Sequence, residues 1–207
     1  MENKLTNTES LKIIEQMINR AKNEERDSGK GWIMWGWMLT IVSIIHYFLI
    51  LYGVKGSGNI WSVFGVFGIV LIAHGIYKRR TRSSERTVKT YTGELVGKIG
   101  DAFFISLIVS MVGAATTGAF NSGVNFGYLL LLYAFWLYIH GAAFRFDPMK
   151  YGAYVNWLGA LAIFLWYREL GKNVLIVHAL CVILGYIIPG YMAQRKFDQQ
   201  ANSKVNG

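Results

Sequence analysis

Long apolar runs separated by short polar stretches dominate the pattern of this chain. Runs without Asp, Glu, Lys or Arg cover residues 32–52, 60–77, 102–119, 126–143, 153–167 and 173–193. A helix rises about 1.5 Å per residue, so about 20 apolar residues cross a hydrocarbon layer of about 30 Å. Backbone groups in lipid must be paired within their own segment. The runs therefore predict an all-α bundle of six transmembrane helices.

The basic residues favour one side of the predicted bundle. With the N-terminus inside, all but three of the 21 Lys and Arg residues lie on the cytoplasmic side; the exceptions are Lys55, Arg168 and Lys172. Because cytoplasmic loops carry the excess of basic residues, both termini are predicted to be cytoplasmic. The net charge of +9 is then explained by contact with anionic headgroups, and nucleic-acid binding is not expected.

Polar segments flank the predicted transmembrane domain, residues 32–193. Residues 1–31 predict a cytoplasmic amphipathic helix, in which Thr6 and Glu9 form a capping box. This helix either lies on the membrane or offers a docking surface to a cytoplasmic protein partner. Residues 78–101 form a basic cytoplasmic loop, and residues 194–207 a cytoplasmic tail.

The second, fourth and sixth runs end alike, as IAHGIYKRR, YIHGAAFRF and IIPGYMAQRK. This similarity predicts three repeated hairpins, residues 32–77, 102–143 and 153–193, related by an axis along the membrane normal. Alternatively, the ends are similar because every one of them meets the same interface. Pro189 stands in the third copy where the others have histidine, and it is expected to leave one backbone carbonyl without its helical partner.

Small and polar residues suggest how the helices pack. Small residues spaced four apart in the third run predict a close helix contact and a central position for this helix; they are Ser106, Ser110, Ala114 and Gly118. Asn156, Thr116, Thr117 and Ser43 are candidates to line a narrow polar cavity. Trp61 and Trp166 are expected to be anchors at the outer interface. The sequence is compatible with both a monomer and a homo-oligomer.

All four histidines lie inside the predicted spans, where ionisable residues are candidates for function because they are costly to hold in lipid. His74 and His140 lie about 5 Å inside the cytoplasmic edge, and His46 and His178 about 21–22 Å from it, at about 1.5 Å per residue. The histidines therefore form two layers. In the simplest interpretation they are structural, with the buried rings bonded to a Ser, a Tyr or a backbone carbonyl, and no cofactor is bound.

An alternative interpretation is a membrane b-type cytochrome. Two histidine pairs at two depths, His46 with His178 and His74 with His140, are what two b haems need as axial ligands. In this count and depth the chain is similar to the cytochrome b561 class of six-span dihaem proteins. It departs from that class because its histidines come from helices one, two, four and six rather than four consecutive helices.

Other stretches carry a second resemblance, which extends over nearly the whole chain. ESLKIIEQMINRAKN, WGW, HGAAFRFDPMKYGAYVNW and GYIIPGY together resemble a group of uncharacterised small six-span proteins of the bacterial inner membrane. The resemblance implies a fold and a multi-pass location in the cytoplasmic membrane, without an activity. The expected function is a non-catalytic module for binding, sensing or anchoring a partner. A small-molecule or ion transporter is the first alternative, and the cytochrome is the second.

Overall fold

The computed structural model describes residues 29–66, 68–70 and 91–205, which are helical apart from turns and contain no strand. The helices are α2 (Lys30–Leu51), α4 (Tyr91–Thr117), α5 (Val124–Ala143), α6 (Asp147–Leu170), α7 (Val174–Val182) and α8 (Ile188–Val205). A shorter apolar helix covers Asn59–Val70. Three short turns complete the fold, the 3-10 turns η1 (Ala119–Asn121) and η2 (Gly171–Asn173) and the π-helical turn η3 (Ile183–Ile187).

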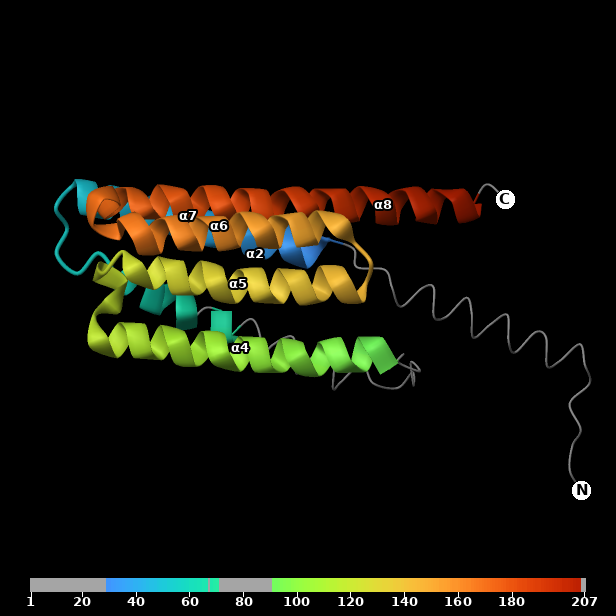
Figure 1. The fold of residues 1–207 in the computed structure, drawn as a ribbon, viewed down its shortest axis with the longest axis horizontal. Coiled ribbons are helices and arrows are strands. Elements are labelled where there is room, and N and C mark those ends of the chain that lie inside the picture. The colour runs from blue at the N-terminus through green and yellow to red at the C-terminus, as the bar shows by residue number, and fades with distance from the viewer. Residues whose placement is uncertain (1–28, 67, 71–90, 206–207) are drawn as a thin grey trace, which may run out of the picture.

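Several helices are long and apolar enough to cross a membrane, which agrees with the predicted all-α membrane protein, while the six spans and their orientation stay a prediction. These helices are Lys30–Leu51, Tyr91–Thr117, Val124–Ala143 and the continuous helical stretch Asp147–Gln199. The last of these reverses direction at η2, so that α6 and α7 run antiparallel (Figure 1). Two of the predicted segments lie mostly outside the described residues. They are the amphipathic helix at 1–31, of which only the last three residues are described, and the basic loop at 78–101.

The fifth apolar run gives a longer helix than its 15 apolar residues predict. α6 begins at Asp147 and has Pro148 in its first turn. The N–H groups of the first turn have no acceptor within the helix, so a proline there costs no hydrogen bond. The helix therefore starts six residues before the apolar run and spans 24 residues.

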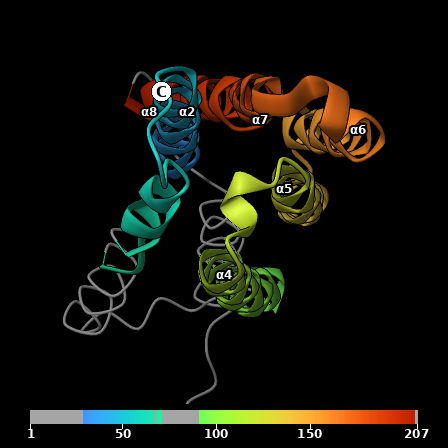
Figure 2. The ribbon, with the colours of Figure 1, turned by 90° about the vertical axis from the view of Figure 1, so that its left-hand side faces the viewer.

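The helices stand side by side in an arc, seen along the bundle in Figure 2. α2 packs on α7, η3 and α8, α6 packs between α7 and α5, and α4 packs on α5. The Asn59–Val70 helix meets α4 across the opening of the arc, where a Cβ at Gly65 would lie 2.9 Å from Met111 Cε. Aromatic side chains from α2, the Asn59–Val70 helix, α4, α5, α6 and η3 fill much of the interior.

The turns at one end of the bundle contain glycines with positive φ. Gly53 and Gly56 lie between α2 and the Asn59–Val70 helix, Gly118 begins the turn from α4 to α5, and Gly171 joins α6 to α7. Glycine adopts this left-handed conformation without steric strain, which allows these short reversals. Neighbouring helices are thus joined as hairpins, while the internal repeat stays a prediction.

α6 and η3 approach each other more closely than side chains would allow. A Cβ placed on Gly152 would lie 2.6 Å from Gly185 O and 2.9 Å from Gly185 Cα. Pro189 follows in the first turn of α8 and is buried. Proline cannot donate to the carbonyl four residues before it and its ring crowds that carbonyl, so the preceding turn widens into a π-helix.

The small-residue stripe predicted for the third span does not make the close contact. Ser106, Ser110 and Gly118 are exposed on α4, and only Ala114 of the stripe is buried. The buried face of α4 consists instead of Val96, Gly100, Phe103, Leu107 and Ala114. In lipid a helix face gains from packing contacts, and the face with Phe103 turns inward, where its ring stacks on Trp136 of α5 at 5.4 Å. Close backbone packing is found instead between Gly152 of α6 and Gly185 of η3, and between Gly29 and Gly190 of α8.

Candidate functional site

A buried polar cluster lies between α2, the Asn59–Val70 helix, α5 and α7. We call it the histidine cluster and define it by Ser43, His46, Trp61, Phe126 and His178. The exposed fraction is 1% for His46 and 0% for Ser43, Trp61 and His178. An unpaired charge in such surroundings is costly, so the neutral imidazole is the form to consider for both histidines.

The contact with Trp61 determines which ring nitrogen of His46 carries the proton. The Nε1–H of Trp61 donates a hydrogen bond to Nδ1 of His46 over 2.9 Å. An indole N–H can only donate, so Nδ1 of His46 must present its lone pair. A neutral imidazole carries one proton, and in His46 this proton is therefore on Nε2.

The proton of His178 is placed by Ser43. The hydroxyl oxygen of Ser43 lies 2.8 Å from Leu39 O and 2.8 Å from Nδ1 of His178. A hydroxyl has one proton and a carbonyl oxygen only accepts, so that proton goes to Leu39 O. Nδ1–H of His178 then donates to the Ser43 oxygen, and Nε2 of His178 presents a lone pair. This contact confirms the expected bond between a buried histidine and a serine.

The two histidines thus present opposite groups to the interior. Nε2 of His46 is a donor and Nε2 of His178 is an acceptor, and neither has a hydrogen-bond partner within the described residues. Both rings contact the same neighbours. The ring centroid of Phe126 lies 6.0 Å from that of His46 and 5.4 Å from that of His178, and Trp61 touches both rings. Because buried polar groups nearly always have partners, this pair marks a candidate binding site.

An aromatic column connects the histidine cluster to the end of α5. Ring centroids lie 6.0 Å apart between His178 and Tyr133, 5.8 Å between Tyr133 and Tyr186, and 5.5 Å between Tyr186 and Trp32. His140 follows at 4.7 Å from Trp32. The structure therefore brings His46 and His178 together and places His140 at the far end of the column, while His74 lies outside the described residues.

Of the four residues expected to line a cavity, Ser43 belongs to the histidine cluster and the other three do not. Asn156 is buried, and its amide nitrogen donates to Gly152 O over 2.8 Å and to Cys181 O over 3.3 Å. Thr116 and Thr117 are exposed on α4, where both hydroxyls donate to the carbonyl of Gly113 in their own helix. The predicted grouping is wrong because a threonine in a helix satisfies its hydroxyl on the preceding turn and needs no distant partner.

The donor pattern of the histidine cluster does not fit a haem ligated by both histidines. An axial imidazole binds iron through a nitrogen lone pair and donates the proton of its other ring nitrogen to a neighbour. His178 fits this requirement, since its Nδ1–H meets Ser43. His46 has the reverse arrangement, because its Nδ1 accepts from Trp61 and its Nε2 is protonated. Among the described residues no group of three or more His, Cys, Asp or Glu side chains is placed to hold a metal ion.

Trp61 is the site residue that the sequence analysis assigned wrongly. It is fully buried and bonded to His46, not an anchor at the interface, whereas Trp166 is 53% exposed. The depth of Trp61 in the bundle could have indicated its contact with His46. His46 lies five residues before the end of α2 at Leu51, and Trp61 is the third residue of the Asn59–Val70 helix, so a hairpin brings both to similar depth.

Comparison of the chain with models of protein families, with curated proteins and with solved structures finds no match. The histidine cluster is therefore interpreted from its own geometry.

Proposed function

We propose that this protein is a multi-pass protein of the bacterial cytoplasmic membrane that binds a small uncharged molecule at the histidine cluster and acts without catalysis. The proposed topology has six transmembrane helices and both termini in the cytoplasm. The bacterial membrane is suggested by the resemblance of the sequence to small six-span inner-membrane proteins.

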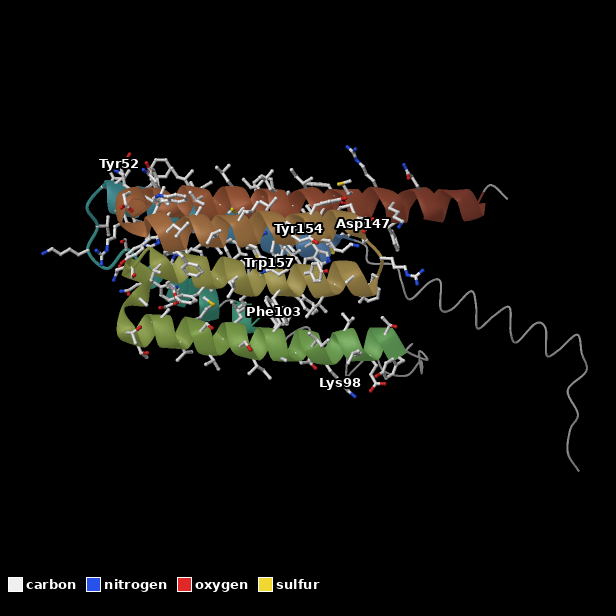
Figure 3. All side chains as sticks on the ribbon, in the orientation of Figure 1. Tyr52, Lys98, Phe103, Asp147, Tyr154 and Trp157 are labelled. Atoms are coloured by element: carbon white, nitrogen blue, oxygen red, sulfur yellow. The ribbon has the colours of Figure 1, made fainter. Side chains whose placement is uncertain are left out.

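The distribution of charge over the bundle supports this topology. Lys98 and the ion pair of Asp147 and Lys150 lie at one end of the bundle, and Tyr52 lies at the other (Figure 3). The basic residues of the described helix ends divide in the same way: Lys30, Lys98, Arg145, Lys150, Arg195 and Lys196 lie at the first end, and Lys55, Arg168 and Lys172 at the second. The first end then faces the cytoplasm and its anionic headgroups.

The observation that carries the binding function is the pair of Nε2 atoms of His46 and His178. One donates and the other accepts, both are buried, and neither is used within the described part of the chain. Two such groups left unpaired would destabilise the fold by about 1–3 kcal/mol each. A bound molecule that pairs with both removes this penalty. An uncharged molecule is favoured because the cluster contains no charged side chain that could balance a charge on the ligand.

The direction of the hydrogen bonds supports a role without catalysis. A catalytic serine gives its proton to a neighbouring histidine, which acts as a base. In the histidine cluster the proton of Ser43 is directed to Leu39 O, and His178 donates to Ser43. The serine is therefore held as an acceptor that orients His178.

Native mass spectrometry of the protein released from lipid nanodiscs tests this function. We expect a bound small molecule, lighter than a phospholipid, on the wild type and on the control variant Ser110→Ala, whose serine is exposed on α4. In His46→Phe and His178→Phe the bound fraction should fall by about tenfold or more, as expected when a binding free energy of about 1.4 kcal/mol is lost. Absence of any bound molecule, or equal occupancy in all four proteins, would contradict the proposal.

A further inference from the structure

The two unused ring nitrogens also indicate the chemical class of the ligand. We propose that the histidine cluster binds a neutral hydroxyaromatic molecule, with its hydroxyl group between His46 and His178 and its ring against the aromatic side chains. This inference rests on the proposed binding function and specifies its ligand.

A hydroxyl group matches both nitrogens at once. Its oxygen accepts from Nε2–H of His46, and its proton goes to the lone pair on Nε2 of His178. A ketone or ether oxygen can only accept, so it would leave His178 unpaired. A carboxylate can also only accept, and it would bring a negative charge into a cluster that has no cation to balance it.

The positions of the two histidines suit a shared ligand. Ser43 and His46 are three residues apart on α2, so they lie on the same face of the helix, about 5–6 Å apart at Cβ. His178 is held at Ser43 over 2.8 Å, and His46 is held at Trp61 over 2.9 Å. Both imidazoles are thus fixed through Nδ1 and share Phe126 and Trp61 as ring neighbours, which leaves Nε2 as the ring nitrogen for a ligand in each.

Aromatic rings pack against both imidazoles and favour an aromatic ligand. The Trp61 and Phe126 centroids lie 5.3 Å apart at an interplanar angle of 60°, and Phe126 meets His178 at 5.4 Å and 67°. Phe120 stacks on Trp61 at 6.0 Å and 15°. Aromatic pairs of this kind gain about 0.5–1.5 kcal/mol beyond their burial, which an aliphatic alcohol would not obtain. A neutral hydroxyaromatic molecule also dissolves in the lipid around the bundle.

The test uses phenol and two aromatic analogues, anisole, which is one methyl group larger, and toluene, which has the size of phenol, on protein labelled with ¹⁵N at histidine, in lipid nanodiscs. Anisole keeps the oxygen as an acceptor but has no proton to donate, and toluene has neither group. We expect phenol to shift the signals of His46 and His178 in a saturable manner and to leave His140 unchanged. Anisole should bind about tenfold more weakly, because Nε2 of His178 remains unpaired. Toluene should bind still more weakly.

Variants assign the response to the site. Trp61→Phe keeps an aromatic ring but removes the N–H that fixes His46, so phenol affinity should fall, while Ser110→Ala should retain it. Thermal unfolding of each variant shows whether it is folded. Equal binding of phenol and anisole, or a shift of His140 as large as those of His46 and His178, would overturn the inference.

The failure of this inference differs from the failure of the proposed function. If a bound molecule depends on His46 and His178 in mass spectrometry but phenol shifts neither signal, the site binds another class of ligand. If phenol binds selectively but the purified protein never carries a bound molecule that depends on these histidines, the ligand class stands and the function as a binding module fails.

Discussion

Replacing Trp61 with alanine is expected to lower the free energy of unfolding by about 3–5 kcal/mol, the range for removing a large aromatic side chain from a packed core. Trp61 is fully buried and contacts both histidines and three phenylalanine rings. The substitution also leaves Nδ1 of His46 without its donor. Reversible unfolding in mixed micelles, followed by circular dichroism, measures the change.

Trp166→Ala is the matched control, because Trp166 is 53% exposed and lies near the end of its helix at Leu170. This change should lower the free energy of unfolding by no more than about 1 kcal/mol, as for a surface position. Similar effects of the two substitutions would mean that Trp61 is an interfacial residue, and the histidine cluster would lose the contact that orients His46.

Replacing Gly152 with alanine should destabilise the protein by about 2–3 kcal/mol, since an added methyl group in a tight core forces the backbone to move. Its Cβ would lie 2.6 Å from a backbone oxygen of η3, where no side chain can rotate away. Asn156 of α6 also donates to Cys181 O of α7, shortly before η3, so movement of α6 away from η3 would strain this bond between α6 and α7. The same unfolding measurement detects the loss.

Gly113→Ala provides the comparison within another helix of the bundle. A Cβ at Gly113 would have nothing within 4 Å, and alanine is favoured over glycine in a helix by about 0.5–1 kcal/mol. This variant should therefore be as stable as the wild type or slightly more stable. If Gly152→Ala behaves in the same way, α6 and η3 are not in backbone contact.

The sequence predicts the helices well because apolar runs and their lengths are local properties. The predicted end of the third run at residue 119 lies close to the end of α4 at Thr117, where Gly118 turns the chain. The start of α6 is less visible, because its first turn contains Asp147 and Lys150 and is not apolar. Hydropathy finds the part of a helix that lies in lipid, and it misses polar turns that continue the helix.

Which face of a helix turns inward is harder to predict in a membrane protein. In a water-soluble protein the buried face of a helix is apolar and the exposed face is polar. In this protein both faces are apolar, so small residues were the only signal for the buried face. Ser110 on α4 and Gly152 on α6 are both small, yet only Gly152 is buried against another backbone. The difference lies in the neighbouring helix, which the local pattern does not contain.

The candidate site is only partly visible in the sequence. Equal depth correctly suggested that His46 and His178 are neighbours, because the rise per residue is constant in helices. Their protonation depends on Trp61 and Ser43, whose side chains reach them through tertiary packing. Depth in the bundle therefore predicts the pair. The hydrogen bonds are needed to decide whether the two histidines are haem ligands or a donor and an acceptor for another molecule.

The ¹⁵N spectrum of the four histidines, recorded on the labelled protein in nanodiscs before any ligand is added, tests the central claim most directly. Protonated and unprotonated ring nitrogens have well-separated shifts, so the spectrum gives the tautomer of each imidazole. The structure predicts that neutral His46 carries its proton on Nε2 and neutral His178 on Nδ1. The same tautomer in both residues, or a charged imidazole in either, would contradict the account.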